Sequence, residues 1–380
     1  MCNGMKKKHG LTESQRKRFD FKNNLPLLFT ALTFIITILI PSLMQAGSLN
    51  IPSSKWGLSI GNSKSFTGLR FNYRDREVEK INGLNFTLWK PFEEYGQSVV
   101  TGISFGTLPG AGELRGLNFG LIGMAAGNQA VGINIGLVGA GSKNNLYGIN
   151  LGGLGTGAGK RMVGLNIGGL GVGAGESLAG LNLGGLGLGA GKNLIGINVG
   201  GLGLGAGDNL IGLNIGLAGA RAGKNLKGVT LAGVGAGAGE NLTGLVMAGL
   251  GAGAGENFTG LMVAGLGAGA GEKTTGMMVA GLGAGAPSVD GVLIAGLAAG
   301  GTQLRGLFVS AGTIKLTKNG HLHGVSLSSF NYLRGRVYGL SIGLVNYAWE
   351  VRKGFQLGLV NIIRDNPKGL RVLPLLNTSW

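Results

Sequence analysis

The sequence has very little cysteine, proline, aromatic residue or acidic charge. Its one cysteine is Cys2, so no disulfide can form within the chain and the body of the protein has no cysteine for a metal site or a catalytic thiol. With 8 Pro residues and no Gly at every third position, a collagen-like structure is excluded. The Asp and Glu residues of the repeats occur singly in turns, so paired carboxylates for acid–base catalysis are not evident.

What the chain has in abundance is glycine, with 81 residues, and much of it lies in a repeat. Residues 164–179 form a sixteen-residue unit that recurs across residues 111–290 with little variation. Such a fixed spacing predicts a repeat architecture for the whole segment. The leading glycine of the unit returns at Gly116, Gly132, Gly148, Gly164, Gly180, Gly196, Gly212, Gly228, Gly244, Gly260 and Gly276.

Within a unit, large and small residues alternate with a period of two, which predicts strands and not helices. Interior glycines would also destabilise helices by about 1 kcal/mol each relative to Ala. The alternation changes phase at Gly168-Gly169: Leu165 and Ile167 precede the change, and Leu170 and Val172 follow it. We therefore expect a bend or bulge at the glycine pair that returns these apolar residues to one face.

Two sheets can be built from these units, a parallel β-solenoid with one unit per coil or an antiparallel meander with one strand per unit. In a solenoid, residue i lies beside residue i+16, and stacked Asn side chains can bond to each other. The turn position alternates between Lys160, Glu176, Lys192, Asp208 and Lys224, which suits parallel stacking because opposite charges then become neighbours. The Asn residues in register are Asn118, Asn134, Asn150, Asn166, Asn182, Asn198 and Asn214.

The alternative to the solenoid is an outer-membrane antiparallel β-barrel, which could serve as a pore. The chain ends in Trp380, and residues 370–380 alternate in the way that barrel strands do. The phase change at each glycine pair and the aromatic content of 6% count against it. The sequence thus predicts an all-β, glycine-rich repeat protein, a β-solenoid in preference to a barrel, with inward rows of Leu, Ile and Val forming a thin core.

The N-terminal residues 1–46 predict export. Residues 1–24 carry seven basic and two acidic residues, and residues 25–46 form a largely apolar run that ends before small residues at Ala46-Gly47-Ser48. This order is typical of a secretory signal peptide, with an uncleaved N-terminal anchor as the alternative. The basic flank would keep the N-terminus in the cytoplasm and place the repeats outside.

The remaining chain divides into an irregular β cap over 47–110, the sixteen-residue repeats over 111–290, and fifteen-residue repeats with a basic cap over 291–380. From residue 301 onward there are ten basic residues but only two acidic ones, Glu350 and Asp365. Envelope or membrane components, such as anionic lipid or polysaccharide, are therefore expected partners. An apolar strip at Met247, Met262 and Met278 is a candidate for self-association.

No segment predicts catalytic, cofactor-binding or metal-binding residues. Gly187–Asn193 resembles a phosphate-binding loop in composition, but Asn193 stands where Ser or Thr would hold magnesium, so a repeat turn is expected. His321 and His323 could give two metal ligands, but no third ligand lies near in sequence, so a solvated loop is expected. Nucleic-acid binding is not expected of an exported chain without a recognised module.

The C-terminal units carry a family resemblance. Residues 339–346 read Gly-Leu-Ser-Ile-Gly-Leu-Val-Asn, residues 354–361 read Gly-Phe-Gln-Leu-Gly-Leu-Val-Asn, and the chain closes with Leu-Pro-Leu-Leu-Asn at 373–377. This pattern, clearest over 324–380, is similar to that of bacterial surface-repeat-containing proteins of the leptospiral type. The resemblance implies an exported cell-envelope protein and supplies no site residues. We expect a structural or adhesive, non-enzymatic surface protein.

Overall fold

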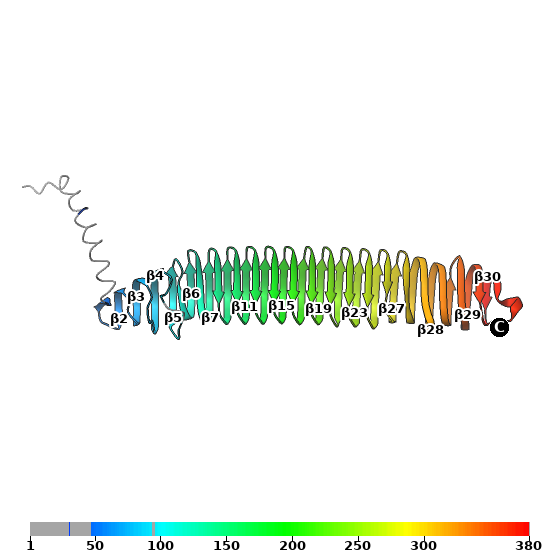
Figure 1. Ribbon diagram of the computed structural model, residues 1–380, viewed down its shortest axis with the longest axis horizontal. Coiled ribbons are helices and arrows are strands. Elements are labelled where there is room, and N and C mark those ends of the chain that lie inside the picture. Colours follow the sequence, from blue (N-terminus) through cyan, green and yellow to red (C-terminus); the bar gives the residue numbers. More distant parts are fainter. Residues whose placement is uncertain (1–29, 31–46, 93–95, 380) are drawn as a thin grey trace, which may run out of the picture.

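The computed structural model describes Thr30, residues 47–92 and residues 96–379. These residues form one long rod, a β-solenoid of about 18 turns wound along a single axis (Figure 1). The predicted fold class is confirmed. The alternative of an antiparallel barrel is wrong, because successive units pair in parallel. No helix among the described residues is long and apolar enough to cross a membrane. The predicted signal or anchor over 1–46 lies, apart from Thr30, outside the described residues.

One coil of the array contains a long strand and a short strand. In the coil that starts at Arg161, β11 (Arg161–Gly168) is followed by a bend at Gly169-Leu170, by β12 (Gly171–Ala174) and by a second bend. Strand β11 lies between the long strands of the two neighbouring coils, so that Asn166 is beside Asn150 on one side and Asn182 on the other. The register of sixteen residues expected from the sequence is confirmed.

The same pattern of strands continues along the chain. The N-terminal strands are β1 (Ser48–Pro52), β2 (Trp56–Gly61), β3 (Ser65–Arg74), β4 (Lys80–Trp89), β5 (Val99–Gly106), β6 (Gly110–Gly120) and β7 (Gly123–Gly136). The other long strands of the array are β9 (Asn145–Gly152), β13 (Ser177–Gly184), β15 (Asn193–Gly200), β17 (Asn209–Gly216), β19 (Asn225–Ala232), β21 (Leu242–Ala248), β23 (Asn257–Ala264), β25 (Lys273–Ala280) and β27 (Ser288–Ala295). The other short strands are β8 (Gly139–Ser142), β10 (Gly155–Ala158), β14 (Gly187–Ala190), β16 (Gly203–Ala206), β18 (Gly219–Ala222), β20 (Gly235–Ala238), β22 (Gly251–Ala254), β24 (Gly267–Ala270) and β26 (Gly283–Gly285). The C-terminal elements are β28 (Ala298–Ile342), β29 (Val345–Ile363), the 3-10 helix η1 (Lys368–Leu370) and β30 (Val372–Thr378).

The leading glycine of each unit is required by the close approach of neighbouring coils. Gly164 has a φ of +126°, and a Cβ there would lie 2.0 Å from the carbonyl oxygen of Gly148 in the preceding coil. Only glycine adopts this backbone conformation without strain, and any side chain would break the contact between coils. The recurrence of this glycine in every coil therefore follows from the geometry of stacking.

The faces of the coil differ from those expected. Asn166, Val172 and Ala174 are buried inside the coil, whereas Leu170 is half exposed and Leu165 and Ile167 lie on the outer side of β11. The bend at the glycine pair is present, but it does not bring the apolar residues to one face. In both strands of the coil the residues of one parity point inward, and the alternation is interrupted only at the bends, as at Leu170.

Several rows run along the interior of the rod, two from the long strands and others from the short strands, such as the rows of Val172 and Ala174. The inner leucine row supplies most of its apolar core, with Leu146, Met162, Leu178, Leu194, Leu210, Leu226, Leu242 and Phe258 all fully buried. The inner asparagine ladder is the row Asn118 to Asn214 named above, in which each Nδ2 before the last donates to the Oδ1 of the next coil at 2.7 to 2.8 Å. The last, Asn214, donates to the hydroxyl of Thr230 at 3.3 Å. After Thr230 the ladder position is apolar from Val246 to Phe308, and Val246, Met262 and Met278 fill the same interior space.

Both ends of the rod carry an antiparallel strand. Strand β1 pairs antiparallel with β2, and β30 pairs antiparallel with β29, so the stack ends in a different geometry from its body. Near the N-terminal end, Arg70 replaces Asn in the interior row and is fully buried. Its guanidinium donates to Asp75 at 2.6 Å and to Asn85 at 2.8 Å, so the buried charge is paired with a carboxylate while its Nε has no hydrogen-bond partner.

Candidate functional site: an apolar face along the rod

The most prominent surface feature is a continuous apolar face. Two rows define it, and we call them the outer leucine row and the strand row. Side chains of the outer leucine row are between 44% and 60% exposed. Its members are Ile122, Val138, Leu154, Leu170, Leu186, Leu202, Val234, Leu250, Leu266, Leu282 and Leu297. The most exposed members of the strand row are Ile103, Ile133, Ile149, Leu181, Ile197, Leu213, Val229, Leu261 and Leu307.

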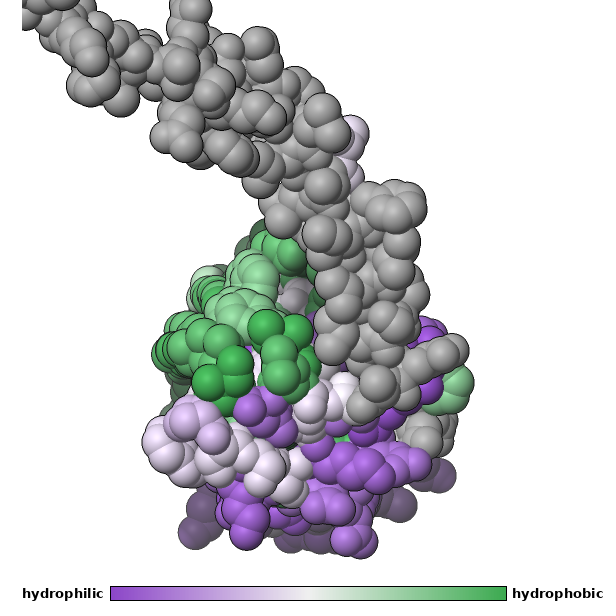
Figure 2. Space-filling model, turned by 90° about the vertical axis from the view of Figure 1, so that its left-hand side faces the viewer, coloured by the Kyte–Doolittle hydropathy of each residue, from purple (hydrophilic) through white to green (hydrophobic). Residues whose placement is uncertain are grey.

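These rows follow directly from the repeat. Leu170 occupies the bend between the two strands of its coil, and Leu181 lies on the outer side of β13. Because every coil repeats the same residue types in parallel register, like side chains stack into straight rows. Figure 2 looks along the rod from its N-terminal end and shows hydrophobic residues gathered on one side, with hydrophilic residues around the opposite side.

The size of this face is unusual for a protein exposed to water. A leucine-sized side chain presents on the order of 100 Å² of apolar area when fully exposed. The two rows together contain 20 such residues at about half of that value, which gives roughly 1,000 Å². The largest apolar patch of a typical soluble monomer is about 300–600 Å². An apolar face beyond that range indicates an interaction surface.

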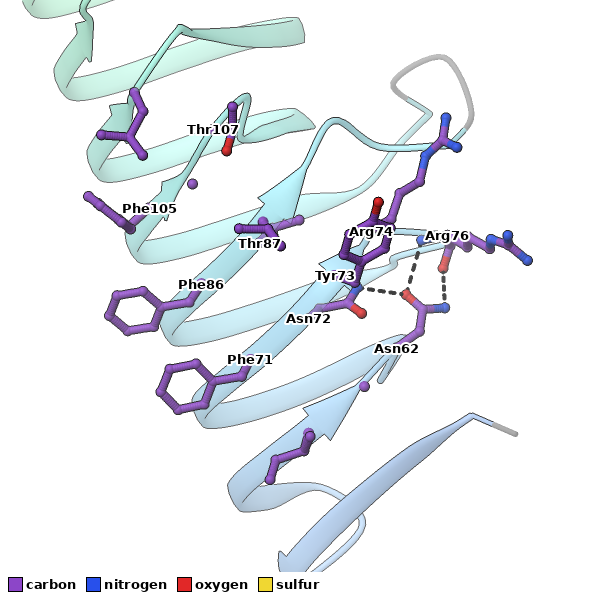
Figure 3. Close-up of a pocket in the computed structure, with 15 residues that line it drawn as sticks. Asn62, Phe71, Asn72, Tyr73, Arg74, Arg76, Phe86, Thr87, Phe105 and Thr107 are labelled. Carbon is purple, nitrogen blue, oxygen red and sulfur yellow. Dashed lines mark hydrogen bonds between the residues drawn. The ribbon is translucent and has the colours of Figure 1, made fainter. Parts of the chain in front are cut away.

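At the N-terminal end the face continues into a pocket of about 590 Å³ (Figure 3). Phe71, Phe86 and Phe105 line one side of it, one from each of three successive coils, and the rings of Phe71 and Phe86 stack with centroids 5.0 Å apart. The guanidinium groups of Arg74 and Arg76 lie at its edge, 4.4 and 4.5 Å from the centre of the Phe92 ring. The pocket is therefore apolar with a cationic rim.

A polar support holds that rim in place. Asn62 accepts a hydrogen bond from the backbone N–H of Arg76 at 3.0 Å and donates one to its carbonyl oxygen at 2.8 Å. The same Asn62 oxygen accepts from Asn72 at 3.3 Å, as drawn in Figure 3. These bonds fix the loop that follows β3 and thereby the position of the two arginines.

The charged turn row lies apart from the apolar face. Lys224 and Lys192 contact the carboxylates of the preceding coils, Asp208 at 3.0 Å and Glu176 at 3.8 Å. The hydrogen bond from Lys224 to Asp208 raises the pKa of that lysine. Each of these lysines lies within ion-pair distance of one carboxylate and not of two, so the alternating charges give a row of separate, exposed ion pairs. Such pairs add little to stability.

The remaining sequence motifs take ordinary places in the solenoid. Residues 187–193 form β14, a bend and the start of β15, with no helix after the glycines. His321 and His323 lie in β28, not in a loop, and the ring of His323 stacks on Tyr338 with centroids 4.5 Å apart. Within residues 47–92 and 96–379, no three His, Cys, Asp or Glu side chains are placed to hold a metal ion.

The predicted methionine strip is wrong. Met262 and Met278 are fully buried in the interior row, while Met247 alone is exposed. The three residues appeared to share a face because their spacing in sequence is close to one coil, but Met247 is shifted by one position and therefore points the other way. The apolar surface lies instead on the outer leucine and strand rows, which the sequence reading had placed in the core.

Sequence reasoning also missed a second Asn ladder, on the outside of the rod. Asn209, Asn225, Asn241 and Asn257 each donate from Nδ2 to the Oδ1 of the preceding coil at 2.8 to 3.0 Å. The donors point toward the N-terminal end here and toward the C-terminal end in the inner ladder. The sixteen-residue spacing of these residues was a usable signal.

In comparisons with family models, with curated proteins and with solved structures, no significant match was found. The solenoid and its surfaces are therefore the basis for the functional argument.

Proposed function

We propose that this chain is an exported structural or adhesive protein of the bacterial cell envelope, and that its role is contact with other molecules and not catalysis. The observation that carries the proposal is the apolar face, which follows the rod over many coils. A surface on which every coil repeats the same residue types suits extended contact with a partner, because each coil adds the same small contact area. A compact ligand would need only a few coils.

Export is supported by the sequence of residues 1–46, in which a basic stretch precedes an apolar run. The similarity of residues 324–380 to bacterial surface-repeat-containing proteins agrees with it. The basic C-terminal part supplies a second kind of contact. Arg336 and Arg352 expose more than half of their side chains while sharing Glu350, and the surrounding segment has eight more positive than negative charges. Anionic lipid or polysaccharide of the envelope is the partner class that such charge attracts.

Cell fractionation with protease treatment of intact cells tests this proposal. The full chain is expressed in a Gram-negative host with a tag at its C-terminus, and a matched chain lacking residues 1–46 is the control. We expect the full chain in the envelope fraction and the control in the cytoplasm. Recovery of the full chain in the cytoplasm would contradict export.

A further inference from the structure

We propose that the apolar face is the interface of an antiparallel homodimer, in which the outer leucine and strand rows of two copies pack side by side along the rods. This inference goes beyond the proposed function, since it concerns what covers the face and holds in whatever compartment the chain occupies. It rests on the area, the period and the charge of the described residues.

The area is sufficient. Roughly 1,000 Å² of apolar surface per copy exceeds the approximately 800 Å² per partner that a stable protein interface buries. The face contains no charged side chain in either row, and the residues between the two rows on the outer side of the long strands, from Phe119 to Val309, are apolar as well. Charge depletion at the centre with an apolar composition is the pattern of a homodimer core.

The period of the face favours a second copy over other apolar partners. Its side chains recur once per coil, at the strand spacing of about 4.8 Å. A second rod has the same period, so the ridges of one copy can fit between those of the other over the whole length, as in a dry sheet-to-sheet contact. A lipid surface has no such period and would gain nothing from the regularity of the rows.

The position of the face and the charges select the antiparallel arrangement. The outer leucine row extends from Ile122 to Leu297, and its middle is at about residue 210, close to the middle of the described body at about residue 213. A twofold axis there covers the face without overhang. Residues 291–380 carry a net charge of +8, while residues 47–110 carry +2. Parallel packing would place the two +8 segments together, whereas antiparallel packing separates them.

Sedimentation of the full chain tests the interface with a closely matched control. In the test variant, Leu186→Glu and Leu202→Glu place two charges in the outer leucine row. In the control, Gly189→Glu and Gly205→Glu place two charges in the same coils on the outer side of the short strands. A Cβ at either glycine meets no atom within 4 Å, and Arg221 already occupies the equivalent position one coil later.

We expect the wild-type chain and the control to sediment as dimers. The test variant should be monomeric, with its dissociation constant raised about 100-fold or more because buried like charges are costly. A monomeric wild-type chain, or a dimer that survives the leucine substitutions, would overturn the proposal. Vesicles of phosphatidylglycerol and phosphatidylcholine test the other occupant: capture of a wild-type monomer that depends on Leu186 and Leu202 would also overturn it, in favour of a lipid surface.

Cross-linking tests the direction of packing and does not need the glutamate variants to fold. With Cys2→Ser as background, Leu170→Cys and Leu250→Cys are made as separate single-cysteine chains, differing in tag length, and are mixed before treatment with a short bis-maleimide. A twofold axis near residue 210 brings residue 170 of one copy beside residue 250 of the other. We expect mainly mixed cross-links. Mainly like-with-like cross-links would contradict the antiparallel arrangement.

Discussion

The two halves of the array solve the same packing problem with different chemistry. From Asn118 to Asn214 the interior row is a chain of hydrogen-bonded amides, whereas at Val246, Met262 and Met278 it is apolar. The backbone register is the same in both halves. A solenoid coil therefore accepts either a continuous polar row or a continuous apolar row. Continuity matters because an amide with no amide beside it would keep only longer contacts, such as those to backbone carbonyls at 3.3 to 3.4 Å.

A neighbouring pair of interior positions also differs between one coil of each half. In the Asn half, Gly184 faces Leu188, and a Cβ on that glycine would lie 2.8 Å from Leu188 Cδ2. In the apolar half the corresponding pair is Ala248 with Ala252, both buried. Ala252 is smaller than Leu188. The difference in volume is made up by Ala248 in place of Gly184 and by the larger side chain at the ladder position. Between these two coils the interior keeps a similar volume although its polarity changes.

We expect the largest loss of stability when an amide is placed in the interior row of the apolar half. Met262→Asn would bury a side-chain amide between Val246 and Met278, which offer it no hydrogen-bond partner. The loss of packing and the unsatisfied polar group together should lower the free energy of unfolding by about 3–5 kcal/mol. Denaturant unfolding followed by circular dichroism, with Met262→Leu as the control, measures it. If Met262→Asn lowered the free energy of unfolding by less than Met262→Leu does, the interior would have to supply water or other hydrogen-bond partners to the amide.

We expect the next largest loss of stability when the inner asparagine ladder is interrupted. Asn182→Ala removes the acceptor of Asn166 and the donor to Asn198, and it should cost about 2–3 kcal/mol. The control is Asn209→Ala in the outer ladder, where water can replace the lost bonds and the cost should be about 0.5–1 kcal/mol. Hydrogen exchange of the coil amides reports the local loss, since repeat proteins lose stability locally. Equal costs at both sites would contradict the distinction between the ladders.

A smaller effect tests the coupling of volumes. Gly184→Ala should destabilise the protein by about 1–3 kcal/mol through overpacking against Leu188 and the backbone. The penalty should be smaller when Leu188→Ala is already present. A double-mutant cycle on unfolding free energies measures the coupling, which we expect to exceed about 0.5 kcal/mol. Additive costs would mean that the two positions vary independently.

The smallest effect concerns the charged turns. Lys224→Ala removes an exposed contact with Asp208, and we expect no measurable change in unfolding at neutral pH in physiological salt. Because the pair raises the pKa of Lys224, any stabilisation is present below the ordinary lysine pKa and is lost as pH rises through the raised value. Unfolding curves of both chains from neutral to strongly alkaline pH check this sign. A difference in unfolding free energy between the two chains that is present at strongly alkaline pH and absent at neutral pH would contradict this sign.

The sequence predicts the solenoid because two ladders of residues favour parallel stacking. The side chains of Asn118 to Asn214 can bond to one another only if residue i lies beside residue i+16. The alternation of Lys and carboxylate residues at the turns favours the same arrangement. The leading glycines at Gly164 and its equivalents mark the spacing of the coils. Fold and register thus follow from the pattern of repeats.

The inward face could not be predicted from hydrophobicity, because both sides of each strand carry apolar residues. Leu165 and Ile167 have the composition of a core, but they lie outside, and Asn166 lies inside. An amide row is stable there because each amide is satisfied by the next, and this is a property of the stack and not of one unit. The apolar face was missed for the same reason. Once the Asn row is placed inside, the residues that share the parity of Asn182 on both strands, such as Leu178, Leu188 and Ala190, are also placed in the interior.

The most direct test of the account is the parallel register of successive coils, measured by disulfide formation at two positions of one unit. In a Cys2→Ser chain, one variant carries Thr243→Cys with Thr259→Cys, and another carries Gly237→Cys with Gly253→Cys. Adjacent parallel strands place both pairs within the Cα separation of roughly 4.4–6.8 Å that a disulfide spans. We predict that mild oxidation closes an intramolecular disulfide in both variants. An antiparallel arrangement can bring at most one of the pairs together, so closure in only one variant, or in neither, would contradict the solenoid.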